Sequence, residues 1–163
     1  MKIGVISDTH IPATARKMPP GLLKALSGCD LIIHAGDLVD MGVLECLKKI
    51  TRVEAVRGNM DQSDKCDMLE NKKILDICGK KIGIMHGCGN PKDLIGLLKK
   101  EFSGQKLDII IFGHSHSPMN RCIDGTLFFN PGSPTDTIFA PYRSYGIIEI
   151  NGDKINAKIH KLV

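Results

Sequence analysis

The first half of the chain alternates short apolar runs with segments of helical spacing. The runs at 2–7 (KIGVIS), 30–36 (DLIIHAG) and 52–58 (RVEAVRG) are rich in β-branched residues and are typical of buried strands. Between them, residues 19–28 and 41–50 carry apolar side chains three and four positions apart, which is the spacing of one helix face. Strands that alternate with helices predict a mostly parallel sheet with right-handed crossovers.

The second half is richer in strand patterns. Short turn sequences at Gly79–Lys80, Asp124–Gly125 and Asn151–Gly152 each separate two apolar runs, and they predict three hairpins. The segment 91–102 begins with a proline and has leucines at helical spacing, so we expect a helix there. No linker or internal repeat divides the chain. We therefore expect an α/β fold in a single domain that spans residues 1–163.

Composition and charge exclude two classes of partner. The formal net charge is +4, the lysine pairs are scattered, and only 4% of the residues are aromatic. A nucleic-acid-binding module would need a concentrated basic stripe interleaved with aromatic side chains, so we expect no specific nucleic-acid binding. No apolar run approaches the length of about 18 residues that a membrane span requires, so we expect no membrane association.

The cysteines indicate a reducing compartment. The six cysteines are at least ten residues apart, which leaves neither a CxxC metal knuckle nor a CxxC redox pair. The apolar run at the N-terminus (MKIGVISD) is too short for the apolar region of a secretion signal. These features predict a cytoplasmic protein.

Polar side chains follow five of the apolar runs at the point where each run ends. The endings are VISDTH, IIHAGD, AVRGN, IMHG and IFGHSH. In open α/β sheets the loops after the carboxyl ends of the strands meet, and ligands bind there. The side chains that we expect to converge are Asp8, His10, Asp37, Asn59, His86, His114 and His116.

These seven side chains have the chemistry of a transition-metal centre. Imidazole, carboxylate and amide oxygen suit Mn, Fe, Zn, Co or Ni, and the absence of thiolate argues against a structural zinc site. Taken singly, Asp8, Asp37 and Asn59 are turn formers or helix caps, and His86 is a buried, hydrogen-bonded histidine. Their joint occurrence favours metal binding. Seven ligands are too many for one tetrahedral ion and suit two octahedral ions that share a carboxylate, which is a dinuclear centre.

The order of these motifs resembles that of a known family. They are DTH (8–10), GD (36–37), GNMD (58–61), HG (86–87) and GHSH (113–116). In this order they resemble the motifs of the calcineurin-like metallophosphoesterases. The chain length, the N-terminal MKIGVISDTH and the NPGSP at 130–134 are most similar to the small phosphodiesterase subfamily, which also includes the scaffold subunit of the retromer complex. The resemblance implies a four-layer αββα sandwich of two mixed β-sheets.

The resemblance also implies a division of the ligands. One ion would be held by Asp8, His10, Asp37 and His116, and the other by Asp37, Asn59, His86 and His114. Asp37 would bridge the ions, and Asp37, Asn59 and His86 would belong to the catalytic residues. The cofactors implied are two divalent transition-metal ions, Mn²⁺ first, with Ni²⁺, Fe²⁺, Zn²⁺ and Co²⁺ as alternatives. A hydroxide between the ions would attack phosphorus in line.

The GHSH segment carries a prediction of its own. Successive residues of an extended segment point in alternate directions, and Ser115 separates the two imidazoles. We therefore expect His114 to face the ion shared with Asn59 and His86, and His116 to face the ion shared with Asp8 and His10.

One position departs from the family pattern. Many members have a histidine after the motif asparagine, as general acid for the departing alkoxide, whereas this chain has Met60. A thioether cannot donate a proton. Because general-acid catalysis matters most for poor leaving groups, we expect a preference for diesters or activated esters.

Several neighbouring residues have less specific interpretations. His34 lies inside a predicted strand, which favours a packed or hydrogen-bonded role. Asp61 is expected to cap or orient the Asn59 loop. Arg57 and Arg143 are weak candidates for binding substrate phosphate, and the turn at 130–134 is either structural or close to the site.

The leading functional prediction is a metal-dependent phosphodiesterase that acts on a small phosphodiester. The alternative is a non-catalytic, metal-binding scaffold on the same fold, and the complete ligand set favours the enzyme. Substrate selectivity is expected in the loops 60–73 and 133–145. The resemblance leaves a homo-oligomer open.

Overall fold

The computed structural model describes residues 1–162. Within these residues, ten strands form two sheets, with three α-helices and two short 3-10 helices between them. The elements follow in the order β1 (Lys2–Ile6), α1 (Pro20–Leu26), β2 (Leu31–His34), α2 (Gly42–Lys48), β3 (Arg52–Ala55), η1 (Asp64–Met68), β4 (Lys72–Ile77), β5 (Lys80–Met85), η2 (Pro91–Asp93), α3 (Leu94–Glu101), β6 (Ile109–Ile111), β7 (Met119–Ile123), β8 (Thr126–Asn130), β9 (Ser144–Asn151) and β10 (Lys154–Lys161).

The first sheet has the strand order β10-β9-β1-β2-β3. Strands β1, β2 and β3 are parallel, whereas β9 pairs antiparallel with β1 and β10 antiparallel with β9. The central strand β1 is buried from Ile3 to Ile6, while β9 alternates buried and half-buried residues. Continuous apolar runs are expected where both faces of a strand are covered, and alternation where one face is more open.

The second sheet has the strand order β4-β5-β6-β8-β7. Its three inner strands are parallel, and β4 and β7 close its two edges in antiparallel pairing. Both sheets are therefore mixed. The mostly parallel sheet predicted from the first half is limited to β1, β2 and β3, because the C-terminal hairpin β9–β10 completes that sheet.

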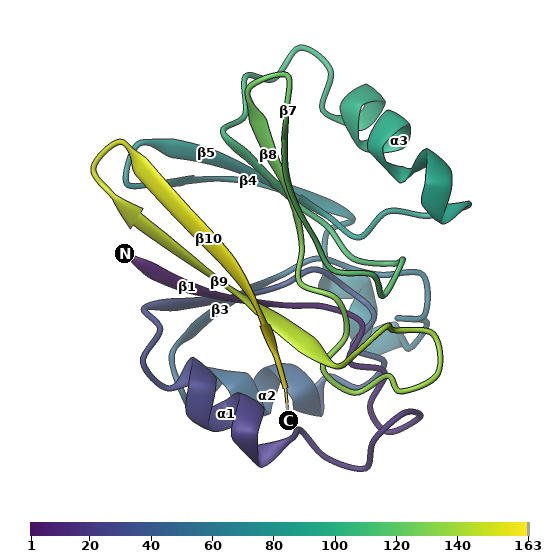
Figure 1. The fold of residues 1–163 in the computed structure, drawn as a ribbon. Coiled ribbons are helices and arrows are strands. Elements are labelled where there is room, and N and C mark those ends of the chain that lie inside the picture. Colours follow the sequence, from purple (N-terminus) through teal and green to yellow (C-terminus); the bar gives the residue numbers. More distant parts are fainter. Residues whose placement is uncertain (163) are drawn as a thin grey trace.

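Three clusters of apolar side chains hold four layers together. Between the sheets, residues such as Ile3 and Ile33 of the first sheet pack with Ile84, Ile111 and Phe129 of the second. A second cluster joins α1 and α2 to the outer face of the first sheet, and a third joins α3 to the outer face of the second (Figure 1). The four-layer αββα sandwich with two mixed sheets, which the family resemblance implies, is confirmed.

The local predictions agree with the structure except at some element ends. The hairpin at Asp124–Gly125 forms as predicted, with both residues at positive φ. The first hairpin turns at Cys78–Gly79, one residue earlier than predicted, because these two residues take the positive φ angles that a two-residue turn requires. The helix predicted over 91–102 begins as the 3-10 turn η2. No helix among residues 1–162 is long and apolar enough to cross a membrane.

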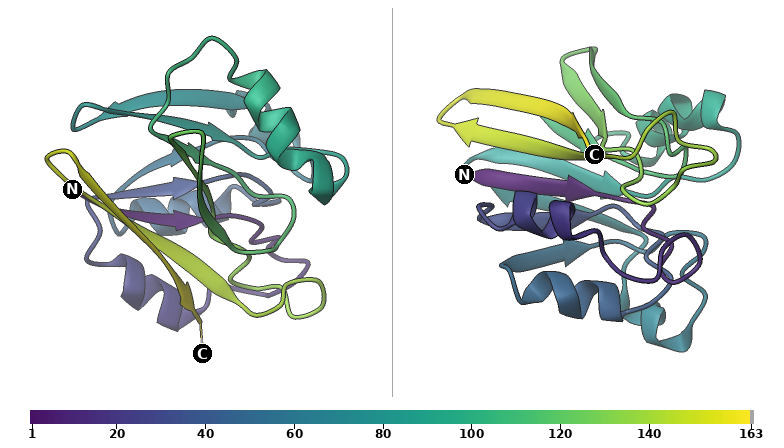
Figure 2. Two further views of the ribbon diagram at one scale, coloured as in Figure 1. Left: turned by 45° about the horizontal axis from the view of Figure 1, so that its top comes forward. Right: turned by 60° about the horizontal axis from the view of Figure 1, so that its bottom comes forward.

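The carboxyl ends of the parallel strands determine where the candidate site lies. The loops that follow β1, β2, β3, β5 and β6 gather at one end of the sandwich, drawn at the right of the right-hand view in Figure 2. All seven predicted ligands lie in these loops.

The space between the sheets allows a test of the packing. A Cβ on Gly146 would lie 2.3 Å from Cε1 of Phe129 and 3.4 Å from Cβ of Val5. We expect Gly146→Ala to lower the free energy of unfolding by about 1 to 3 kcal/mol, the usual cost of overpacking a core. Equilibrium urea unfolding measures the change.

The matched control is Gly96→Ala in α3, where a Cβ would meet no atom within 4 Å. This variant should raise the free energy of unfolding by about 0.5 to 1 kcal/mol, because alanine favours a helix over glycine. Equal stability of wild type and Gly146→Ala would contradict the close contact between the sheets.

Candidate metal centre

Five of the predicted ligands converge in one cluster. We call Asp8, His10, Asp37, His86 and His116 the carboxylate–histidine cluster. The Nε2 atoms of His10 and His116 are 3.1 Å apart, and His116 Nε2 is 3.4 Å from Asp8 Oδ1. Asp37 Oδ2 lies 3.2 Å from His86 Nε2 and 3.5 Å from His10 Nε2. Two nitrogen ligands about 2.1 Å from one ion lie roughly 3 Å apart when they subtend a right angle, so these spacings suit shared ions.

The ligand atoms fall into two groups of three that could each hold an ion. Asp8, His10 and His116 form one group, and Asp8, Asp37 and His86 form the other. Asp8 belongs to both groups, whereas the family resemblance gives the bridging position to Asp37. Asp37 Oδ2 nevertheless faces a histidine of each group, so both carboxylates lie between the two ligand sets.

The other two predicted ligands form a pair beside the cluster. His114 Nδ1 is 3.0 Å from Asn59 Oδ1, and His114 Nε2 is 2.8 Å from the carbonyl oxygen of Gly89. The His114 ring meets the His86 ring edge to face at a centroid distance of 5.5 Å. His114 and Asn59 therefore lie on the side of His86, and His116 lies on the side of His10.

The cluster carries two buried negative charges without a basic side chain beside them. Asp8 and Asp37 are almost completely inaccessible to solvent. Among the side chains that the structure describes, only histidines form ion pairs with these two carboxylates. An uncompensated buried carboxylate costs several kcal/mol, so protons on the imidazoles or bound cations must supply positive charge.

The pKa values of the cluster residues reflect this need for positive charge beside the carboxylates. Burial alone would lower the pKa of His116, but the carboxylates of Asp8 and Asp136 outweigh burial and raise that pKa to about 9. Burial also opposes the charged forms of His86 and Asp37, yet their mutual contact raises the pKa of His86 and lowers the pKa of Asp37. For His10, burial lowers the pKa against the attraction of both carboxylates. A divalent ion would replace these protons.

One buried nitrogen in the cluster has no hydrogen-bond partner. His86 Nδ1 donates its proton to the carbonyl oxygen of Ala35 at 2.7 Å, which leaves the lone pair of the neutral ring on Nε2. Nε2 is buried and forms no hydrogen bond within residues 1–162, although it faces Asp37. A histidine whose second nitrogen is fixed by a carbonyl is the usual arrangement of a metal ligand, so the residues fit a bound ion.

Left-handed backbone conformations bring these side chains together. Positive φ angles occur at Asp8 (53°), His10 (42°), Asp37 (57°), His114 (68°) and His116 (53°). Such angles are unfavourable for residues other than glycine and concentrate at functional sites. Neither the DTH nor the GHSH segment is extended, so the alternation that we assumed for Ser115 and its neighbours is wrong. The left-handed turns direct both histidines of GHSH towards the site.

Asp61 holds the second carboxylate in place. Its buried carboxylate accepts hydrogen bonds from the backbone N–H groups of Asp37 (2.9 Å), Val39 (2.7 Å) and Gly58 (2.7 Å). Gly58 is required here, because a Cβ would lie 2.1 Å from Asp37 Oδ1. The prediction that Asp61 orients this loop is confirmed by these contacts.

Asp136 also contacts the cluster, although the sequence did not predict it as a site residue. Its Oδ2 lies 2.5 Å from His116 Nδ1, which leaves His116 Nε2 to face Asp8. The same loop also contacts the DTH segment, since Ser133 Oγ donates to the carbonyl oxygen of Asp8 and Thr135 Oγ1 to that of Thr9. The NPGSP turn and the residues after it therefore support the cluster. The residue types alone gave no signal for Asp136, which lies 20 positions after His116.

The neighbouring residues have structural contacts. His34 is fully buried, accepts at Nδ1 from the N–H of Gly36 and contacts Thr9 Oγ1 through Nε2, so the packed role predicted for it is confirmed. Burial lowers the pKa of His34 to about 3, which keeps the ring neutral. Arg57 is engaged by the carbonyl oxygen of Asp61 and by the Asp67 carboxylate.

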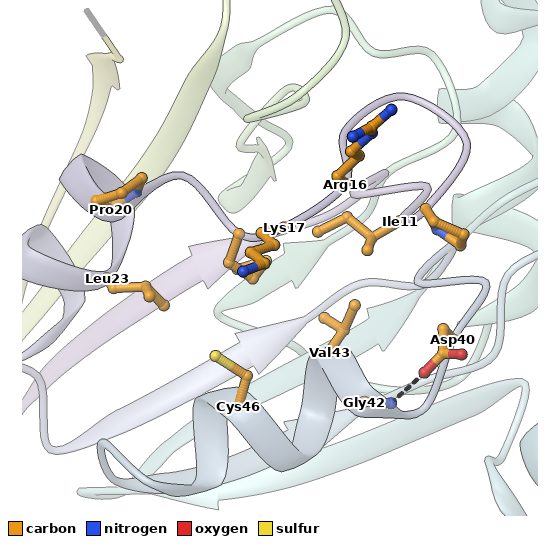
Figure 3. Close-up of a pocket in the computed structure, with 11 residues that line it drawn as sticks. Ile11, Arg16, Lys17, Pro20, Leu23, Asp40, Gly42, Val43 and Cys46 are labelled. Carbon is orange, nitrogen blue, oxygen red and sulfur yellow. Dashed lines mark hydrogen bonds between the residues drawn. The ribbon is translucent and has the colours of Figure 1, made fainter.

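An apolar pocket lies next to the cluster but is separate from it. It has a volume of about 560 Å³, and its lining includes Ile11, Leu23 and Val43 (Figure 3). None of the cluster residues lines it. The Ile11 N–H donates to the carbonyl oxygen of Leu38, so the segment that follows His10 pairs with the segment that follows Asp37. We assign this pocket no part in the chemistry of the cluster.

Comparison with known proteins identifies similar chains. A family model described as "Calcineurin-like phosphoesterase superfamily domain" matches residues 1–153. A protein of Methanocaldococcus jannaschii named "probable metallophosphoesterase" is 39% identical over 166 residues, which cover 98% of this chain and 80% of that protein. A phosphodiesterase of the same organism is 27% identical over 150 residues, which cover 81% and 83% of the two chains.

The fold is also similar to that of a solved protein that binds metal. Vps29 of Entamoeba histolytica, in a crystal structure with Zn²⁺, superposes with a TM-score of 0.78 at 24% identity. The superposition covers 99% of this chain and 98% of Vps29.

The contact between Asp136 and His116 gives a prediction about metal affinity. In Asp136→Asn an amide NH₂ replaces one carboxylate oxygen. It must face either His116 Nδ1 or the backbone N–H groups that donate to the carboxylate in the wild type, so one set of hydrogen bonds is lost. If His116 is a metal ligand, we expect Mn²⁺ to bind about 10- to 100-fold more weakly, as is usual when the partner of a ligating histidine is removed. Calorimetric titration with Mn²⁺ alone measures this.

The control is Asp153→Asn, which removes an exposed carboxylate whose one ion-pair partner within residues 1–162 is Lys80. It should leave metal affinity unchanged. Wild-type Mn²⁺ affinity in Asp136→Asn, at an unchanged melting temperature, would show that Asp136 does not position His116.

Proposed function

The chain belongs to the calcineurin-like phosphoesterase superfamily, and we propose that within it the chain is a metal-dependent phosphodiesterase with two divalent ions at the carboxylate–histidine cluster. The observation that carries the proposal is the pair of buried carboxylates, Asp8 and Asp37, whose described ion-pair partners are histidines and not lysine or arginine. In a structural ion pair a lysine or arginine would neutralise each carboxylate. A metal centre instead needs carboxylate oxygens and imidazole nitrogens that are free to bind an ion.

The cluster residues have distinct roles in this proposal. His10 and His116 would hold one ion and His86 the other, with Asp8 and Asp37 between them. Asn59 and His114 lie beside the His86 side, where their contact with each other occupies the atoms that would bind an ion. When bound, the ions would lower the pKa of a water molecule to supply the nucleophile and would neutralise phosphoryl oxygens.

Other residues keep the cluster in a form that can bind metal. The carbonyl oxygen of Ala35 and the Asp136 carboxylate hold the Nδ1 protons of His86 and His116, so that Nε2 of each ring faces the site. The N–H of Met60 occupies Asp37 Oδ1, which leaves Oδ2 directed at the histidines. The protein thus fixes ligand orientation before an ion arrives.

The chain has no evident proton donor for the leaving group at the position where many family members have histidine. Met60 is 47% exposed beside Asp37, and its thioether cannot donate a proton. Hydrolysis would then depend on leaving groups that depart without general-acid help. This supports diesters with acidic leaving groups over alkyl monoesters.

A non-catalytic, metal-binding scaffold is the second candidate. It is supported by the likeness of the fold to zinc-bound Vps29, which extends over nearly the whole of both chains. A metal site of this geometry would serve a scaffold by ordering the loops after β1, β2 and β6. The two candidates differ in turnover and agree on metal binding.

Turnover by metal-loaded protein tests the proposed function. Protein loaded with Mn²⁺ should bind about two ions per chain, measured by elemental analysis, and should hydrolyse bis-p-nitrophenyl phosphate faster than alkyl phosphate monoesters. Asp37→Asn should lower kcat by at least about a hundredfold and reduce the metal content. Asp40→Asn is the control, because that exposed carboxylate contacts only the N–H of Gly42 among the described residues.

The outcomes separate the candidates. Metal binding without turnover on any ester would favour the scaffold. No bound metal at all would remove the basis of both candidates. Alkyl monoesters hydrolysed as fast as the aryl diester would contradict the leaving-group argument.

The lack of a proton donor at Met60 can be tested separately. Met60→His should raise kcat/KM for a diester with an alkyl leaving group by about tenfold or more and change the p-nitrophenyl diester less, because a general acid helps poor leaving groups most. Met68→His, at another exposed methionine, is the control and should change neither rate. An equal rise for both leaving groups would mean that the new histidine acts by some means other than proton donation.

A further inference from the structure

Two large apolar side chains are exposed on one turn beside the cluster. Ile138 is 81% and Phe139 is 78% accessible to solvent. Exposed apolar side chains that are adjacent to each other and to a functional site are candidates for a contact surface, unlike single scattered ones. The Phe139 ring lies edge to face with the ring of His116, at a centroid distance of 6.4 Å.

Asp136 fixes the turn that presents these side chains. Its Oδ1 accepts from the N–H groups of Ile138 (2.7 Å) and Phe139 (3.1 Å), and its Oδ2 accepts from the N–H of Ala140 (3.0 Å). The same Oδ2 contacts His116 Nδ1. One carboxylate therefore sets both the orientation of a cluster histidine and the backbone that carries Phe139, so the attachment point of the ring is fixed relative to the cluster.

Phe139 lies on a side from which the cluster can be reached. The side chains of His10 and His116 are 12% and 14% accessible, whereas those of Asp8, Asp37 and His86 are at most 3% accessible. The Phe139 ring is next to His116, one of these two more accessible histidines, so an ester bound on this side of the cluster would lie near the ring. Aromatic rings pair favourably at centroid distances of about 4.5 to 7 Å, a range that a ring attached to a bound phosphoryl group can reach.

We propose that Ile138 and Phe139 form a subsite for a flat aromatic substituent of the phosphate ester, with Phe139 as the residue that selects it. This inference rests on the proposed phosphodiesterase function and adds a substrate class to it. A flat ring suits the turn because Phe139 offers a planar face and Ile138 a short apolar edge. The leaving-group argument at Met60, which makes no use of Phe139, favours aryl esters as well.

The test uses two ligands that cannot be hydrolysed. Phenylphosphonate and methylphosphonate bind through the same phosphonate group and differ in the ring. Calorimetry with Mn²⁺-loaded wild-type protein should show phenylphosphonate binding about tenfold more tightly, which is the size of one good stacking contact. Phe139→Ala should abolish this preference with an unchanged Mn²⁺ affinity, and Phe139→Tyr should retain it.

Met68→Ala is the matched control, since Met68 is similarly exposed on η1. It should keep the wild-type preference for the phenyl ligand. A preference that survives in Phe139→Ala would overturn the subsite, and so would equal binding of the two phosphonates by wild-type protein that hydrolyses esters. If metal-loaded wild type binds neither phosphonate and hydrolyses no ester, the proposed function fails and the subsite fails with it.

Discussion

Two buried carboxylates impose the constraint on which the rest of the site depends. Asp8 and Asp37 follow the central strands β1 and β2, and in the part of the chain that the structure describes their charged partners are histidines only. The remaining carboxylate positions are satisfied, since Ser7 Oγ and the N–H of His114 reach Asp8 and the N–H of Met60 reaches Asp37. These hydrogen bonds leave the negative charge of the carboxylates uncompensated. Only protons or cations between the carboxylates and the imidazoles can supply the positive charge that balances it.

Bringing these groups together requires a backbone that is locally unfavourable and is held from outside. Asp8, His10 and Asp37 all have left-handed conformations, which a short loop in water would not retain. The loops after β1 and β2 stabilise each other, because the N–H groups of Asp8 and His10 donate to the carbonyl oxygens of Gly36 and Asp37. The close-packed strands below fix where each loop begins, so the strain is concentrated in the segment that carries the ligands.

The chemical identity of the site could be predicted from the sequence, whereas its geometry could not. Asp8, His10, Asp37 and His86 stand where apolar runs end, and both the run and the residue type are visible in one dimension. The pairing of β9 with β1 depends on residues more than 140 positions apart, so the mixed character of the first sheet came from the family resemblance and not from the runs. Asp136 was missed because its role is defined by one contact across 20 residues, and no local pattern distinguishes it from a loop aspartate.

A ligand cluster of this kind does not by itself decide between an enzyme and a scaffold, because both functions need bound metal. The difference lies in the groups around it. Met60 cannot protonate a departing oxygen, so in the proposed enzyme the rate would depend on how readily the leaving group carries its own negative charge. A phenolic oxygen is ionised near pH 10, about six pH units below water, and an aryl oxide therefore departs without an acid where an alkoxide does not. Phe139 presents an exposed ring on the His116 side of the same cluster. In the proposed enzyme an aryl oxide would leave without a proton and its flat ring would suit Phe139. Met60 and Phe139, which are unrelated features of the site, would therefore favour the same class of ester.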